Sequence, residues 1–87
     1  MASVEIYSTQ FCGYCMRAKR LLSTKDVAVT DYDVFAEPSR RQEMVARSGG
    51  RTSVPQIFIN GTHIGGCDEL YALERSGRLA SMLEATG

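Results

Sequence analysis

Two cysteines separated by two residues, Cys12 and Cys15, are the side chains in this sequence best suited to chemistry. They follow a strand-like run, Val4–Tyr7, and precede a segment with helical periodicity. A cysteine at a helix start meets unpaired backbone N–H groups and the positive end of the helix dipole, and both stabilise a thiolate. Cys15 falls deeper in the first turn on the same side. We therefore predict a redox pair, with Cys12 as nucleophile and Cys15 as resolving thiol.

Two other interpretations of these cysteines stay open. Cys12 and Cys15 could be half of a zinc site completed by His63 and Cys67, whose own spacing suits metal ligands. Against zinc, His63 falls in an expected strand directly after a turn, where a lone histidine is more often a surface residue. The pair could also be ordinary structural cysteines. The strand–turn–helix context favours the redox interpretation over both.

The composition is that of one small globular domain. The chain has 87 residues, 44% hydrophobic and 23% charged, and ten basic side chains balance ten acidic ones. A chain this short must commit its apolar residues to one core, so we expect one domain over residues 1–87. Zero net charge argues against non-specific nucleic-acid binding, which needs clustered positive charge. No apolar run approaches the roughly 18 residues of a bilayer span, so no membrane partner is expected.

The cysteine count and the N-terminal residues predict the cellular compartment. An odd number of cysteines, three, argues against a disulfide scaffold. Residues Met1–Tyr7 include Glu5 and lack the basic start and apolar stretch of a signal peptide. We therefore expect a mature cytoplasmic chain whose thiols are kept reduced.

Hydrophobic periodicity and turn residues predict the element order β-α-β-α-β-β-α. Tyr14, Ala18, Leu21 and Leu22 recur with the helical period and form one apolar face. The expected strands are Val4–Tyr7, Val27–Val34, Val54–Ile59 and Thr62–Ile64, and the expected helices run from Gly13 to about Ser23, from Pro38 to Gly49, and from Asp68 onward with a break at Gly77.

These elements predict a four-stranded mixed sheet with helices on both faces. A helix joins the first two strands, so they should be parallel with a right-handed crossover. Asn60-Gly61 is the strongest short hairpin signal in the chain, a two-residue turn with both residues at positive φ. After Gly65-Gly66 the chain turns, and Asp68 stands where a helix N-cap is expected.

Three separate blocks of the sequence resemble the dithiol glutaredoxins, especially the small bacterial type. The blocks are Cys12-Gly13-Tyr14-Cys15 with Met16–Lys19, then Ser53–Ile59, and then Gly65–Leu70. They occur in the expected order across essentially the whole chain, which is far more specific than one Cys-x-x-Cys motif. The tyrosine within the motif favours glutaredoxin over thioredoxin, whose motif usually reads Cys-Gly-Pro-Cys after a tryptophan, and this chain contains no tryptophan.

The resemblance implies the thioredoxin fold and a glutathione groove beside Cys12. Pro55 would be the cis-proline that faces the active site, and Val54 would pair its backbone with the cysteine moiety of glutathione. Backbone N–H groups of Cys67 and Asp68 would bind the γ-glutamyl carboxylate, and the Asp68 carboxylate would bind its ammonium group. The other implied groove residues are Tyr14 beside the sulfur, Ser53 where threonine is usual, and Gly66, with Gly65, for close backbone approach.

Two positions depart from the family pattern. Many members have a lysine three residues before the first cysteine, and this chain has Thr9, so the glycine carboxylate of glutathione needs another cation. Arg41 is our candidate, with a solvated helix face as its alternative role. Gly13 stands where most dithiol members have proline. In some relatives with a small residue there, the first cysteines of two protomers and two glutathiones hold a [2Fe–2S] cluster.

The resemblance thus implies a glutathione-dependent thiol-disulfide oxidoreductase. Cys12 alone would reduce glutathionylated proteins, and protein disulfides would also need Cys15. Cys67 would lie beside the groove outside the redox couple. We expect glutathione, glutathionylated proteins and protein disulfides as partners of a monomeric chain. The alternative from a different class is a [2Fe–2S] scaffold in which two chains ligate a cluster through Cys12.

Overall fold

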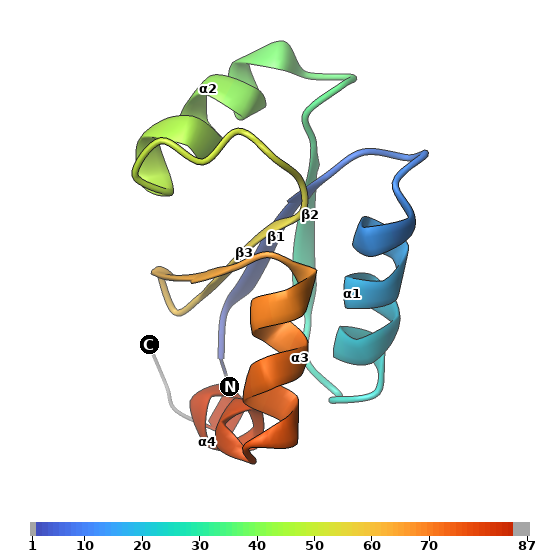
Figure 1. Ribbon diagram of the computed structural model, residues 1–87, viewed down its shortest axis with the longest axis vertical. Helices are drawn as coiled ribbons and strands as arrows, with labels where there is room; N and C mark the ends of the chain where they lie inside the picture. The colour runs from blue at the N-terminus through green and yellow to red at the C-terminus, as the bar shows by residue number, and fades with distance from the viewer. Residues whose placement is uncertain (1, 85–87) are drawn as a thin grey trace.

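Strands and helices follow one another along the chain in the expected order (Figure 1). The computed structural model describes residues 2–84. Its elements are β1 (Val4–Ser8), α1 (Gly13–Ser23), β2 (Val29–Asp33), α2 (Pro38–Arg47), β3 (Gln56–Ile59), β4 (Thr62–Gly65), α3 (Cys67–Arg75) and α4 (Arg78–Glu84). The expected second and third strands were too long, because Val27, Val54 and Pro55 lie outside the sheet.

The sheet has the strand order β2-β1-β3-β4. β1 and β2 are parallel, as predicted for two strands joined by a helix. β3 runs antiparallel to β1, with Ile6 opposite Ile57, and β4 returns antiparallel to β3. Asn60 (φ 52°) and Gly61 (φ 80°) make the predicted turn between them. Gly77, also at positive φ, separates α3 from α4 where the break was expected.

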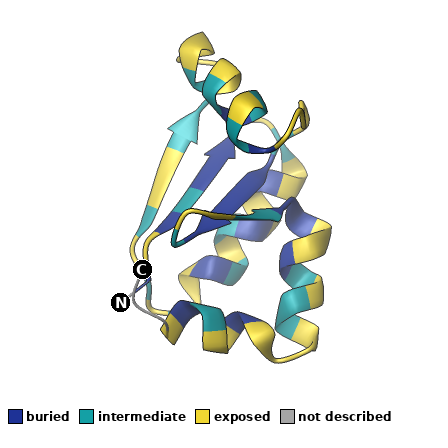
Figure 2. Ribbon diagram, turned by 90° about the vertical axis from the view of Figure 1, so that its left-hand side faces the viewer, coloured by how far each residue is buried: buried dark blue, intermediate teal, exposed yellow. Residues whose placement is uncertain are grey.

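Side chains alternate between two cores, one on each face of the sheet. Ile6 and Ile57 face α1, α3 and α4, whereas their neighbours Tyr7 and Phe58 face α2. Figure 2 shows the buried residues concentrated on the central strands β1 and β3, while the edge strand β2 is more exposed. Helices therefore cover both faces, as predicted. Among residues 2–84, no helix has both the length and the apolar character needed to cross a bilayer.

Polar side chains also attach α2 to the sheet. The Arg47 guanidinium donates to both carboxylate oxygens of Glu5, at 2.9 and 3.0 Å. This hydrogen bonding lowers the pKa of Glu5 against the opposing effect of its burial. The Tyr7 hydroxyl donates to Glu43 and accepts from Arg47 at 2.8 Å. α2 thus depends on a small apolar core and on a partly buried polar network.

Candidate active site

Cys12 occupies the N-cap of α1, as the sequence predicted. Its backbone is extended (φ −115°, ψ 115°), and its sulfur accepts a hydrogen bond from the Cys15 backbone N–H at 3.3 Å. The same sulfur lies 3.9 Å from the Val54 carbonyl oxygen, and Cys12 is partly exposed. A helix N-terminus and a directed N–H donor both favour negative charge on this sulfur. Cys12 is therefore placed as an accessible nucleophile.

Cys15 lies behind Cys12 in the first turn of α1. It is fully buried, and burial, followed by the hydrogen bond with Cys12, raises the pKa of the Cys15 thiol to about 12. The two thiols therefore differ in access, and Cys15 stays protonated at neutral pH. This arrangement fits the predicted division into an attacking and a resolving sulfur.

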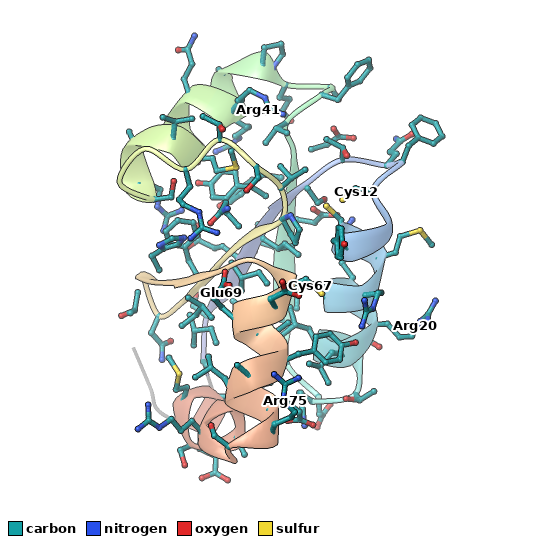
Figure 3. All side chains as sticks on the ribbon, viewed as in Figure 1. Cys12, Arg20, Arg41, Cys67, Glu69 and Arg75 are labelled. Carbon is teal, nitrogen blue, oxygen red and sulfur yellow. The ribbon has the colours of Figure 1, made fainter. Side chains whose placement is uncertain are left out.

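A groove of about 320 Å³ lies beside Cys12 and runs between the loop before β3 and the start of α3. Its lining contains the groove residues that the resemblance implied, apart from Gly65, together with two that it did not name, Arg51 and Glu69. Arg41, the candidate cation, is not part of the lining. The full lining is Tyr14, Arg51, Ser53, Val54, Pro55, Gly66, Cys67, Asp68 and Glu69. Figure 3 shows Cys12 and Cys67 near the N-terminal ends of α1 and α3, with Arg41 apart from them on α2.

Backbone shape defines the middle of the groove. The Val54–Pro55 peptide bond is cis, which confirms the prediction for Pro55. A Cβ atom on Gly66 would lie 3.1 Å from the Pro55 carbonyl oxygen, so the two backbones meet too closely for most side chains. Gly65 is more constrained, with φ at +119° and the Glu69 side chain against the position of a Cβ. The glycines thus fit the packing around Pro55 and Glu69, and the close approach of glutathione to them stays a prediction.

The start of α3 differs from the prediction. Gly66, and not Asp68, is the N-cap, so Asp68 lies in the first turn with an exposed side chain. The Gly66 N–H donates to Glu69 Oε1 at 2.6 Å, and this hydrogen bond lowers the pKa of Glu69. The helix begins earlier than expected, and Glu69 at the third helical position accepts from the N–H of the N-cap Gly66, as the glutamate of a capping box does.

Tyr14 was expected on the apolar face of the first helix, and that expectation was wrong. The buried residues of α1 are Cys15, Ala18 and Leu22, whereas Tyr14 is 59% exposed. Its side chain lines the groove instead. A place beside the reactive sulfur stays a prediction for Tyr14.

Two arginines lie near the groove, and the sequence pointed to only one of them. Arg41 donates to the Thr52 carbonyl oxygen at 2.7 Å, so it contacts the loop that leads to Ser53 without lining the groove. Arg51 lines the groove and pairs with Glu69 at 3.4 Å. Arg51 follows Gly49-Gly50 in a loop without periodicity, so no local pattern marked it.

The zinc interpretation finds no geometric support. His63 Nε2 lies 2.7 Å from Gln56 Oε1, and the ring packs on Phe58 with centroids 5.0 Å apart. Burial, then the charge of Arg51, lowers the pKa of His63. Cys67, the first residue of α3, is 4% exposed and packs in the larger core, and burial raises the pKa of its thiol. Within residues 2–84, no three His, Cys, Asp or Glu side chains gather as metal ligands.

This mixed sheet, with a cis-proline beside a Cys-x-x-Cys helix start, defines a thiol-disulfide oxidoreductase of the thioredoxin fold. A family model described as Glutaredoxin matches residues 4–64. The chain belongs to the glutaredoxin family, as the three sequence blocks implied.

Relatives of known sequence and structure agree with that membership. Glutaredoxin 3 of Escherichia coli (strain K12) is 52% identical over 84 residues, which cover 97% of this chain and all of that protein. The solution structure of glutaredoxin from Brucella melitensis matches with 50% identity and a TM-score of 0.82, over 97% of this chain and 90% of that one. A crystal structure of a buckwheat glutaredoxin–glutathione complex matches with 30% identity and a TM-score of 0.85, over 94% and 76%.

Proposed function

We propose that this chain uses glutathione to reduce glutathionyl mixed disulfides through Cys12, and protein disulfides through Cys12 and Cys15. The observation that carries the proposal is a partly exposed cysteine at a helix N-terminus, whose sulfur lies 3.9 Å from the carbonyl oxygen of Val54, a residue that lines the groove of about 320 Å³. The buckwheat relative was crystallised as a glutathione complex, which supports glutathione as the ligand of the matching groove.

The monothiol route needs only one protein sulfur. The Cys12 thiolate attacks the glutathionyl sulfur, a Cys12–glutathione disulfide forms, and the substrate thiolate leaves and takes up a proton. A second glutathione thiolate then attacks the glutathionyl sulfur on Cys12. Oxidised glutathione departs, and Cys12 leaves as a thiolate that the Cys15 N–H stabilises.

Groove residues would hold the glutathionyl group during both steps. The Val54 backbone would pair with the cysteine moiety of glutathione as a short added strand. The backbone N–H groups of Cys67 and Asp68 lie in the first turn of α3, where they would bind the γ-glutamyl carboxylate, and the exposed Asp68 carboxylate would bind the ammonium group.

The glycine carboxylate would be bound by Arg51, the arginine of the groove lining. Arg41, the candidate from sequence, contacts the Thr52 carbonyl oxygen and would act by positioning the loop before Ser53. Its direct binding of the carboxylate stays a prediction.

Protein disulfides would be reduced by the dithiol route. Cys12 attacks one substrate sulfur, forms a mixed disulfide with the substrate protein and releases its other sulfur as a thiolate. Cys15 then attacks the Cys12 sulfur, so that a Cys12–Cys15 disulfide forms and the second substrate thiolate leaves. Two glutathiones reduce this disulfide and depart as oxidised glutathione. Because Cys15 is buried and its pKa is raised to about 12, it must lose its proton as it attacks. The monothiol route avoids that requirement.

Two serine variants test the proposal. Cys12→Ser should abolish reduction of glutathionylated cysteine in an assay coupled to glutathione reductase. Cys15→Ser should retain that activity and lose mainly the reduction of a protein disulfide, because only the dithiol route uses Cys15. Equal loss of deglutathionylation in both variants would contradict the one-sulfur mechanism.

The [2Fe–2S] scaffold stays a second prediction, which the comparisons do not support. Within the described part of the chain, metal-ligating side chains do not gather in threes, so a cluster would need a second protomer. A Cβ on Gly13 would meet open space, and Cys12 beside it is partly exposed. Anaerobic reconstitution with iron, sulfide and glutathione should give a coloured dimer if the scaffold exists. A colourless monomer would leave only the oxidoreductase.

We further propose one domain over residues 1–87 and action as a cytoplasmic monomer. The three cysteines are unpaired thiols, which fits a reducing compartment. Sedimentation of the purified chain and its localisation in the source cells test these proposals.

A further inference from the structure

Four large apolar side chains remain exposed in the described part of the chain. Among residues 2–84 they are Phe11 (95% exposed), Phe35 (84%), Tyr14 (59%) and Met16 (55%). Phe11, Tyr14 and Met16 flank Cys12 in the sequence, and Phe35 comes from a distant loop. Contiguous exposed apolar surface on a small domain usually marks a place where something binds.

Phe11 and Phe35 share a hollow of about 470 Å³, which Thr9, Gln10, Asp33 and Ala36 complete. Their loops follow β1 and β2, which are parallel, so both loops leave the sheet at the same edge (Figure 1). The hollow is therefore separate from the groove, which the loop before β3 and the start of α3 form.

Phe35 is held in this exposed position by its turn. Asp33 Oδ1 accepts hydrogen bonds from the Phe35 N–H at 2.9 Å and from the Ala36 N–H at 3.0 Å. The Glu37 N–H also donates to the Asp33 carbonyl oxygen at 3.0 Å. An Asx turn of this kind fixes the backbone at Phe35, whose side chain is exposed.

We propose that this hollow docks the apolar side chain next to the reacting cysteine of a protein substrate. The inference rests on the proposed function, because it assigns a substrate class to the same nucleophile. The reacting sulfur of any substrate must contact Cys12, and Phe11 is its immediate neighbour in the chain. A protein attached to that sulfur must therefore cover surface beside Cys12, and the hollow, which Phe11 lines, is an apolar part of that surface.

The residues that line the hollow argue against two other occupants, a second glutathione and a second copy of this chain. Asp33 is the one charged residue that lines the hollow, so an anion such as a second glutathione finds no cation there. A stable dimer needs about 800 Å² and 20–30 residues on each side, whereas this patch consists of a few side chains around a reactive thiol. A brief contact with one apolar residue matches what the patch offers.

The test compares two glutathionylated peptides with identical charges. One has leucine directly beside its modified cysteine, and the other has serine there. The wild-type protein should reduce the leucine peptide with the lower KM. Phe35→Ser should remove that preference by raising the KM for the leucine peptide about fivefold to tenfold, because the apolar contact is lost. Phe11→Ser should act in the same direction.

Glutathionylated cysteine, which is too small to reach the hollow, is the matched control substrate. Both phenylalanine variants should reduce it as the wild type does, and their exposed positions should leave thermal unfolding unchanged. If the wild type reduces this control but treats both peptides alike, the docking inference is wrong and the proposed function stands. If the wild type fails on the control itself, the proposed function is wrong.

Sedimentation of the wild type and of Phe35→Ser separates a homodimer contact from substrate docking. Both should sediment as monomers. A wild-type dimer that Phe35→Ser dissociates would assign the hollow to a second copy and overturn the inference.

Discussion

At the scale of single residues, burial makes the two thiols of the Cys-x-x-Cys pair chemically different. Cys15 is fully buried, with a pKa raised to about 12, whereas Cys12 is partly exposed at a helix N-cap. Because only the thiolate reacts with alkylating agents, iodoacetamide near pH 8 should modify Cys12 and leave Cys15 intact. Cys15 should become reactive only as the pH rises toward 12, where its proton is lost. Mass spectrometry of the digested protein measures both sites.

Unfolding provides the control for this prediction. In guanidinium chloride all three cysteines are exposed and should be alkylated at pH 8, including Cys67, which is buried in the fold. Modification of Cys15 in the folded protein at pH 8, at a rate close to that of Cys12, would show that its sulfur is neither buried nor protonated.

The two arginines near the groove give a second prediction at this scale. Arg51→Gln should raise the KM for glutathione about threefold to tenfold, because the cation of the groove lining is lost. Arg41→Gln should have a smaller effect, because Arg41 contacts only the Thr52 carbonyl oxygen. Steady-state kinetics with varied glutathione measures both. A larger effect of Arg41→Gln would return the carboxylate to the residue that the sequence favoured.

At the scale of elements, the turn from β4 into α3 has no room for a side chain. Gly65 has φ at +119°, and a Cβ there would clash with the side chain of Glu69, whose carboxylate is the acceptor for the Gly66 N–H. Gly65→Ala should therefore lower the free energy of unfolding by about 1–3 kcal/mol and raise the KM for glutathione, because the backbone is strained and Glu69 is displaced from the N-cap of α3. Denaturant unfolding and kinetics measure the two effects.

Gly77→Ala is the matched control. Gly77 also has a positive φ (78°), but a Cβ there meets open space, and the residue lies at the far end of α3. This variant should lose some stability through backbone strain and keep the wild-type KM. If both variants raise the KM equally, the clash with Glu69 is not what shapes the groove.

The sequence predicted these elements well where local chemistry decides the backbone. Asn60-Gly61 and Gly77 appear in the turns expected of them, and the alternation of Ile6 with Tyr7 follows from the two faces of a strand. The sequence predicted α3 to start later than it does. The Glu69 carboxylate accepts a hydrogen bond from the Gly66 N–H at the start of the helix, and sequence position alone does not single out this residue.

Periodicity failed at the reactive end of α1. Tyr14 fits the helical repeat of the apolar face and is nevertheless exposed, because the first turn faces the groove and not the core. Arg51 was missed for a related reason: a loop without periodicity brings it into the groove only through the tertiary fold. Residues that contact a ligand do not follow the pattern set by the core.

At the scale of the whole molecule, the two cores differ in size. α1, α3 and α4 share the larger core, and α1 alone contributes Cys15, Ala18 and Leu22 as buried residues. α2 contributes only Met44, which packs with Tyr7, Val34 and Phe58. A helix with one buried side chain is held by less apolar surface, so α2 should open before the rest of the fold.

Native-state hydrogen exchange tests this order of opening, with a matched pair of core variants. In the wild type, the α2 amides should exchange through a lower free energy of opening than those of α1 and β3.

Met44→Ala and Leu79→Ala each empty a fully buried position, on opposite faces of the sheet, and each should cost about 2–4 kcal/mol of global stability. Met44→Ala should in addition speed exchange in α2 and raise the KM for glutathione, because α2 ends at Arg47, shortly before the Arg51–Pro55 segment of the groove. Leu79→Ala should leave the KM for glutathione unchanged, and it should speed exchange in α2 by no more than its loss of global stability accounts for. Equal protection of α2 and α1 would show that the polar network of Glu5, Tyr7 and Arg47 holds this helix as firmly as the larger core holds the others.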